Sequence, residues 1–473
     1  MREDVRVLSA NDVWITKQSS QELGPSFPEL PLTRLPDLLR GGVIGATTAY
    51  YLTRHPSYMT ALHHITLLEA TSIAAAASGK AGGLLGLWAY PTCLVPLSYR
   101  LHAELAAEHN GAERWGYRRL ECGQLTASIR KKKPISSSPT KSRKRSSIGA
   151  AAKQEDGPDS PLTDGQVEWQ KLPKQDEAAS ALLHQSVLPA DLDWINGSLV
   201  HEYAEMGLPG FTETAQVHPF QFTTSIAALA REGGAEIRVN SKVTSIGLNK
   251  SSTAVSSVEY LDRVTGETLT LEGVTDVVVA AGPWTGSLWP RTKVEGLRAH
   301  SVVFAADVSP YAVFTDISLP HDWVPAHRAA RGEKRKHKGN VDPEIYARPG
   351  GEVYACGEPD SIIPLPETAD QVECDESQCD DLISYIGTVS PVLGEAAVAA
   401  KQACYLPRHM RFGKESAPLI GGTSVSRLWI ASGHTCWGIQ NGPATGKLMS
   451  EFIFEGEAKS ADIAELNPKR FKV

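Results

Sequence analysis

Hydrophobic and polar residues alternate most regularly in the second half of the chain, and this pattern predicts many short strands and a few helices. Helical spacing of apolar residues predicts helices over 219–232, 381–389 and 444–454, and we also expect a helix over 394–400. Alternating or continuous apolar runs predict strands over 235–239, 243–246, 255–261, 268–271, 274–281, 298–306, 344–348, 352–356 and 428–431. This mixture of elements indicates an α/β protein.

The first half of the chain is less uniform. Residues 40–95 have a β–α–β texture, and we expect helices over 96–128. Residues 1–35 are rich in proline and predict an unstructured N-terminus. Residues 130–166 hold almost no large apolar side chain, so we expect a disordered insertion that adds nothing to a core. Its basic run is typical of a solvated loop, with a nuclear signal or a phosphorylated segment as the alternative.

Composition narrows the class of protein. The chain has 473 residues, 41% of them hydrophobic, and a net charge of −7, so it can bury the core of a globular protein of two or three domains. The acidic balance gives no general reason to bind nucleic acid. No apolar run is long enough for a membrane span and no signal peptide is recognisable, so we expect a cytoplasmic protein. The seven irregularly spaced cysteines predict free thiols and no metal site.

A glycine-rich segment opens the first predicted helix. It reads RGGVIGA over 40–46, and an apolar strand over 65–68 follows and ends at Glu69. Gly42 would let the backbone approach a pyrophosphate, Gly45 would let helix and strand pack closely, and the helix N-terminus would face the phosphates. Glu69 would accept hydrogen bonds from ribose hydroxyls. Together these features predict a dinucleotide site in a Rossmann-like fold, with a glycine-rich turn before an ordinary helix as the alternative.

Arg40 stands where the GxGxxG pattern has its first glycine, and the residues before it are unlike a buried strand. A long side chain does not suit the tight turn, and Pro36 is poor in a central strand. If this segment is native, we expect weaker cofactor binding. The alternative hypothesis is that the residues up to Arg40 come from a mis-predicted exon boundary, which sequencing of the transcript would test.

Later segments complete a resemblance to a known family. They are a small-residue loop over 74–83, a QVHP stretch over 216–219, an apolar strand over 276–281 and a GHTCWGIQNGP turn over 433–443. In this order they resemble the FAD-dependent oxidoreductases of the D-amino-acid oxidase type, which include glycine and sarcosine oxidases. The likeness covers roughly 41–128 and 210–460 and is greatest with fungal members, one of which is linked to endosomal trafficking.

The resemblance implies an α/β fold of two domains. A Rossmann-like FAD-binding domain with a parallel sheet and helices would comprise 36–95, 210–297 and 405–473, and a substrate domain with a mixed or antiparallel sheet would comprise 96–209 and 298–404. It also implies FAD as the cofactor. The residues that would bind it are Gly41, Gly42, Val43, Ile44, Gly45, Glu69, Ala70, Ser78, Gly79, Lys80, Ala81, Gly82, Gly83, Val243, Ala281, Gly282, Trp284, Gly433, His434, Cys436, Trp437, Gly438 and Ile439.

The resemblance determines the substrate side less well. Amino-acid oxidases of the family hold the substrate carboxylate with an arginine, but Leu406 stands at that position here. Arg408, Arg411 or Arg348 would have to replace it. This departure argues against a plain amino-acid oxidase.

Other residues are carried over as candidates for the reaction. The candidate catalytic residues are His434, Trp437, Arg408 and Tyr346, and Tyr354 is a further candidate for the pocket wall. Cys404 lies where sarcosine oxidases attach flavin covalently. We expect FAD to be bound non-covalently, with a bond to Cys404 as the alternative.

The implied reaction is oxidation of a C–N bond in a small amine or an amino or imino acid, by hydride transfer to flavin N5. The expected partners are this small-molecule substrate and molecular oxygen as the candidate electron acceptor. The alternative is a non-catalytic or weakly catalytic member of the fold that acts in endosomal trafficking, and this alternative would add an endosomal location.

Overall fold

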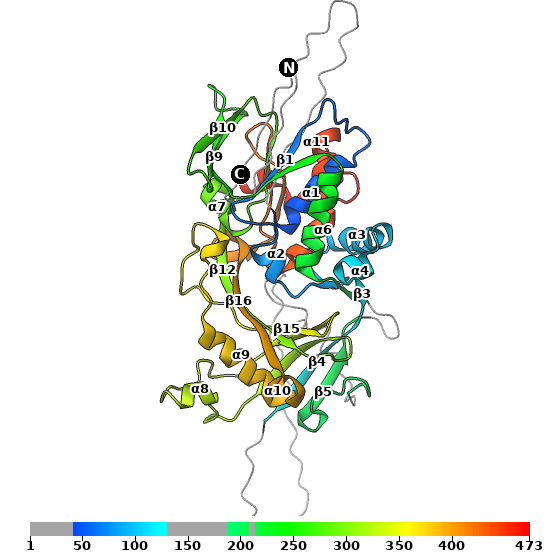
Figure 1. The fold of residues 1–473 in the computed structure, drawn as a ribbon, viewed down its shortest axis with the longest axis vertical. Helices are drawn as coiled ribbons and strands as arrows, with labels where there is room; N and C mark the ends of the chain where they lie inside the picture. The colour runs from blue at the N-terminus through cyan, green and yellow to red at the C-terminus, as the bar shows by residue number, and fades with distance from the viewer. Residues whose placement is uncertain (1–40, 130–187, 208–212) are drawn as a thin grey trace, which may run out of the picture.

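The computed structural model describes residues 41–129, 188–207 and 213–473. Two units are stacked along the long axis of the molecule (Figure 1). One contains the helices α1 (Val43–Thr53), α6 (Pro219–Glu232) and α11 (Gly438–Glu455) with several small sheets, and the other is built on one eight-stranded sheet. Arg40, the N-terminal segment and the low-complexity insertion lie outside the described residues.

Helix α1 forms the centre of the first unit. All of its residues except Tyr51 are buried, because it packs between α6 and α11 and against β1 (Ile65–Leu68). The close approach of α1 to α11 depends on glycine, since a Cβ on Gly446 would lie 2.5 Å from the carbonyl carbon of Thr47. Thr47 Oγ1 also donates to the Gly442 carbonyl at 2.8 Å. The packing holds the N-terminal ends of both helices close together.

Short sheets complete the first unit. Two pairs are parallel, as predicted for a Rossmann-like domain: β1 with β7 (Ala235–Arg238), and β11 (Val277–Val279) with β19 (Leu428–Ser432). Strand β18 (Leu419–Gly422) runs antiparallel to β19. The remaining strands are β8 (Ser241–Leu248), β9 (Val255–Asp262) and β10 (Thr268–Glu272) in one meander, and β2 (Leu84–Gly86), β6 (Thr214–Gln216) and β3 (Arg118–Arg119) in another sheet.

Helices α3 (Val95–Glu108) and α4 (Gly111–Trp115) share the core of this first unit, although the sequence assigned 96–209 to the substrate domain. Two polar contacts tie α3 to α11: Ser98 Oγ accepts from the Ala444 N–H at 3.1 Å, and His102 Nε2 lies 2.9 Å from the Ile439 carbonyl. The apolar stripe of α3 faces the same core. The domain boundaries themselves stay a prediction.

The second unit is a mixed sheet, as predicted. Its strand order is β17-β16-β12-β15-β14-β13-β4-β5, and only the pair β13 and β4 is parallel. The bounds are β17 (Lys414–Ser416), β16 (Ala397–Arg411), β12 (Val294–Ala305), β15 (Glu352–Cys356), β14 (Glu344–Arg348), β13 (Tyr311–Ser318), β4 (Glu121–Ser128) and β5 (Val200–Glu205). Alternate residues point to opposite faces, so Ile345 enters one apolar cluster and Tyr346 another.

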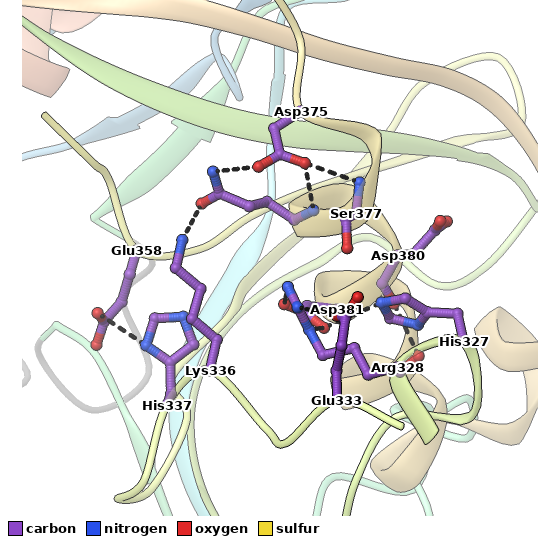
Figure 2. Close-up of polar contacts among 12 residues, drawn as sticks. His327, Arg328, Glu333, Lys336, His337, Glu358, Asp375, Ser377, Asp380 and Asp381 are labelled. Atoms are coloured by element: carbon purple, nitrogen blue, oxygen red, sulfur yellow. Dashed lines mark hydrogen bonds and ion pairs between the residues drawn. The ribbon is translucent and has the colours of Figure 1, made fainter. Parts of the chain in front are cut away.

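Helices α9 (Glu376–Val389) and α10 (Pro391–Glu395) cover the face that carries Ile345. A charged cluster joins α9 to the loop that carries α8 (Ala326–Ala329) (Figure 2). Arg328 donates from Nε and Nη2 to the two carboxylate oxygens of Asp381, each at 2.6 Å. His327 Nε2 lies 3.2 Å from the same carboxylate. The cluster therefore fixes a long loop to the outer layer of the sheet.

Two helical predictions are wrong. Residues 118–128 form β3 and β4 instead of the end of a helical segment, and β4 is paired with β13 on one side and β5 on the other. Residues 397–400 begin the long strand β16, which pairs with β12, and α10 ends at Glu395. Residues 397–400 are mostly alanine, which favours a helix, so pairing with distant strands overrides the local preference in this stretch, as it does in 118–128.

All seven cysteines are free thiols. Within the described ranges, none of the helices combines the length and the apolar character that crossing a membrane requires.

Candidate functional site

A cavity of about 1760 Å³, including its open mouth, lies where the two units meet. Its wall comes from the N-terminal ends of α1 and α11, the loop after β1, and strands of the large sheet. Many residues predicted to bind FAD line it: Gly41, Gly42, Val43, Ile44, Glu69, Ser78, Ala81, Gly82, Gly83, Gly282, His434, Cys436, Trp437, Gly438 and Ile439. Segments distant in sequence are therefore brought together as a single cleft.

The first end of the cavity has the groups that a nucleotide requires. Gly42 is the N-cap of α1 without a side-chain cap, and the helix presents its positive end there. Ser78 Oγ accepts from the Val43 N–H at 2.9 Å, which fixes the loop against the helix. Glu69 is 3% exposed, and its Oε1 accepts from both the N–H and the hydroxyl of Thr71 at 2.7 Å. The carboxylate is thus held rigidly at the cavity wall, where a ribose hydroxyl can donate to it.

Backbone geometry shapes the middle of the cavity. Gly83 has φ +82°, and a Cβ there would overlap the Val217 carbonyl oxygen, so only glycine fits. Ser432 ends β19, and Gly438 begins α11 after the 3₁₀ turn Thr435–Trp437. The start of α11 thus supplies a second positive helix end beside the cavity.

His434 is a buried side chain to which no described residue is hydrogen-bonded. The side chain is 3% exposed and lines the cavity, and neither ring nitrogen has a hydrogen-bond partner among the described residues. Burial lowers the pKa of His434 to about 3, so the imidazole is neutral and has one N–H donor and one acceptor nitrogen. Because unpaired buried polar groups are costly, this position calls for a polar ligand group. The residues present therefore fit FAD.

The far wall of the cavity is one face of the hairpin β14–β15. Glu344 lies opposite Cys356, and Tyr346 lies opposite Tyr354, with the two tyrosine rings stacked 5.9 Å apart. All four side chains line the cavity, and Trp437 lies there too. The Tyr346 hydroxyl donates to the Glu344 carboxylate. Sequence reasoning missed Glu344, although its two-residue spacing from Tyr346 in a predicted strand was a usable signal.

Other predicted residues lie outside the cavity lining. Arg408 Nη2 donates to Glu295 at 2.6 Å, and Arg411 Nη1 donates to the Phe471 carbonyl at 3.0 Å. Arg348 lies next to the wall, but its guanidinium donates to the Ala81 carbonyl and lies over the Tyr354 ring. The other predicted residues that do not line the cavity are Gly45, Ala70, Gly79, Lys80, Val243, Ala281, Trp284 and Gly433.

Cys404 does line the cavity and is 8% exposed. Burial raises the pKa of its thiol to about 11, and the nearby Lys80 ammonium only partly opposes this effect. A thiol held in its protonated form is a weak nucleophile.

Comparison with known proteins places the chain in a family. Residues 41–452 match DAO, described as FAD dependent oxidoreductase. The chain is 35% identical to the Saccharomyces cerevisiae protein TDA3, over 92% of this chain and 94% of the yeast protein. Its fold is similar to that of glycine oxidase from Geobacillus kaustophilus, with a TM-score of 0.61, 17% identity, and 92% and 98% of the two chains covered.

A second similar fold is L-proline dehydrogenase from P. horikoshii, with a TM-score of 0.60, 14% identity, and 94% and 99% of the two chains covered. At such identities these structures support the fold alone. The family match, the relative and the cleft at the N-terminus of α1 agree with one another. The chain therefore belongs to the DAO family of FAD dependent oxidoreductases, and FAD is its cofactor.

Proposed function

We propose that this FAD-dependent enzyme oxidises a C–N bond of a small amine or an amino or imino acid. The observation that supports this most is the continuous cavity that runs from Gly42 and Glu69 to an enclosed wall of Tyr346, Tyr354 and Trp437. The similar folds are those of a glycine oxidase and a proline dehydrogenase, whose names both refer to amino acids.

The chain's residues have separable tasks in this proposal. The N-terminus of α1 and Glu69 hold the nucleotide part of FAD by its phosphates and ribose. His434 would offer FAD a neutral hydrogen-bonding group, and the positive end of α11 would stabilise negative charge on the reduced flavin. FAD supplies the hydride acceptor at flavin N5 when it is bound.

The aromatic wall excludes water and orients the substrate. Trp437 and Tyr346 are each 6% exposed, and the ring of Phe314 lies 5.9 Å from Tyr346 in an edge-to-face contact. A small substrate confined between this wall and the cofactor is held in a few orientations, which lowers the entropic part of the barrier.

Anaerobic mixing of the purified yellow protein with a metabolite panel tests the proposal. We expect an amine or an amino or imino acid to bleach the flavin, whereas its alcohol analogue does not. Peroxide release in air would further identify molecular oxygen as the acceptor. A protein that is reduced only by alcohols or hydroxy acids would contradict the proposal. A yellow protein that no substrate bleaches would favour the alternative, a non-catalytic protein of the fold in endosomal trafficking.

A further inference from the structure

The hairpin that joins β16 to β17 carries a phenylalanine where its turn favours another residue. Phe412 and Gly413 form the two-residue loop, with φ +49° and +75°. Such loops favour asparagine followed by glycine, because most side chains are strained in the left-handed region. The Phe412 side chain is 97% exposed, so burial does not compensate for this strain. A strained and exposed aromatic residue indicates a task outside the fold.

Cationic side chains gather beside this tip. The Arg411 guanidinium lies over the rings of Phe412 and Phe471, 5.3 Å and 5.2 Å from their centroids. It also donates to the Phe471 carbonyl at 3.0 Å, which holds the 3₁₀ turn Pro468–Phe471 against the hairpin. The turn and the residue after it bring three exposed cations to the same surface: Lys469, Arg470 and Lys472.

The acidic residues on and beside the hairpin are turned to other groups. Glu295 accepts from Arg408 at 2.6 Å. The carboxylate oxygens of Glu415 are buried. Burial, and then the Glu344 and Glu415 carboxylates, raise the pKa of the Cys436 thiol, so Glu415 lies toward Cys436. The surface around the hairpin tip is therefore positive, although the whole chain has a net charge of −7.

An exposed ring among cations fits the surface of a membrane that contains anionic lipids. Such a surface attracts lysine and arginine by charge, and an aromatic ring enters the boundary between headgroups and acyl chains. A fluid bilayer adapts to one exposed ring. A protein partner needs a matching pocket instead, and single-stranded nucleic acid needs a groove with several aromatic residues. The hairpin tip therefore favours lipid over either of them.

We propose that the tip of the β16–β17 hairpin docks the protein reversibly on an anionic phospholipid bilayer. Phe412 inserts its ring, and the lipid headgroups contact four cations: Arg411, Lys469, Arg470 and Lys472. Phe412 does not line the FAD cavity, so this inference goes beyond the proposed function and does not depend on it.

Sedimentation of the full-length, FAD-bound protein with lipid vesicles tests the proposal. Phosphatidylcholine vesicles with about 30% phosphatidylserine are the anionic surface, and pure phosphatidylcholine vesicles are the neutral control. We expect at least about tenfold tighter binding to the anionic vesicles, because each cation near the surface adds to the attraction. Most of this binding should be lost in about 0.5 M salt, which screens the charges.

Two matched variants separate the hairpin tip from other exposed apolar residues. Phe412→Asn removes the ring and suits the turn, so it should fold at least as well as wild type. Its affinity for anionic vesicles should fall about tenfold, because the apolar group that enters the bilayer is lost. The control Val264→Asn removes a 77% exposed side chain from the hairpin between β9 and β10 and should bind like wild type.

A third variant tests the cations. Lys469→Glu combined with Arg470→Glu reverses two charges beside Phe412 and should lower the affinity for anionic vesicles at least about tenfold. Its affinity for pure phosphatidylcholine vesicles should stay as weak as that of wild type.

Three results would overturn the proposal. One is equal binding of wild type and Phe412→Asn, because the basic run over 130–145 would then attract the vesicles. Another is the absence of binding to anionic vesicles at low salt. The third is a dimer in solution that Phe412→Asn abolishes, in a protein that binds no vesicles, since the tip would then bind a second copy of the chain.

Discussion

The protein contains two groups of buried polar side chains that differ in how fully the fold pairs them. At the outer layer of the large sheet, Asp381 is 3% exposed and is bonded through both oxygens to Arg328 (Figure 2). In the cavity, His434 is equally buried, and its ring has no partner within the described residues. The Asp381–Arg328 pair stabilises the fold without a ligand, whereas a bound ligand supplies hydrogen-bond partners to the His434 ring.

The largest expected effect on the free energy of unfolding comes from breaking the pair of Asp381 and Arg328. The variant Asp381→Asn removes one of the two carboxylates paired with Arg328, since Glu333 is the other at 2.9 Å, and weakens two charge-assisted hydrogen bonds, so it should lower the free energy of unfolding by about 3 kcal/mol. Urea unfolding of wild type and variant measures this difference. FAD content per folded chain should not change, because the cluster lies outside the cavity lining. A variant as stable as wild type would show that the pair contributes no net stability.

The buried His434 should make the free energy of unfolding depend on pH. The pKa of folded His434 is about 3, whereas an unfolded histidine titrates near 6.5. Below pH 6.5 the unfolded chain therefore takes up a proton that the folded protein refuses. The contribution of neutral His434 to the free energy of unfolding is therefore fully present above pH 6.5. It is lost as the pH decreases, by at most about 1.4 kcal/mol per pH unit. Urea unfolding of the apoprotein at pH 7 and pH 5 measures the loss.

The variant His434→Leu separates this residue from the other buried histidines, since His63, His102 and His409 also have a pKa lowered to about 4 by burial. The loss between pH 7 and pH 5 should be smaller in the variant. An identical loss would show that His434 does not titrate in this way.

At neutral pH the same variant should have opposite effects on the two states of the protein. Without FAD, His434→Leu removes a buried polar group that has no hydrogen-bond partner among the described residues, and should raise the free energy of unfolding by about 1 kcal/mol. With FAD, it removes a hydrogen-bonding group and should weaken cofactor binding about fivefold or more. Apoprotein unfolding and FAD titration measure the two effects. Destabilisation of the apoprotein would mean that His434 serves the fold.

The smallest expected effect is at Cys404. Its thiol is kept protonated by burial, so we expect no bond to flavin. Acid precipitation should release all of the yellow colour, and Cys404→Ser should have the same FAD content as wild type. Flavin that stays with the denatured wild-type chain, but not with the variant, would establish covalent attachment.

The cavity and the outer layer of the large sheet also differ in how well the sequence predicted them. Gly42, Glu69 and the turn from Gly433 to Gly438 were recognisable because phosphate binding and close backbone approach restrict the residue types within short segments. Asp381 and Arg328 gave no such signal, since they are 53 residues apart and meet only through the packing of α9. Glu344 was predicted only in part. Its strand was expected over 344–348, but the sequence did not show that the Glu344 side chain lines the cavity.

Strand pairing explains the errors in the fold. The helix α6 begins and ends as predicted, because Pro219 and the apolar stripe define it locally. The strands β4 and β16 were missed, although β12, the partner of β16, was predicted over 298–306, because β16 begins with the alanine-rich residues 397–400 and only its pairing with β12 reveals it as a strand. The local sequence pattern predicted an element correctly where that segment alone determines its conformation. It failed where pairing with a distant strand determines the conformation.

The central claim is that one FAD molecule occupies the cavity between Glu69 and His434. Measurement of FAD released from the purified, FAD-saturated protein tests it most directly. The account predicts one FAD per chain and a higher melting temperature than that of the apoprotein. A folded protein that stays colourless in excess FAD, with an unchanged melting temperature, would contradict it.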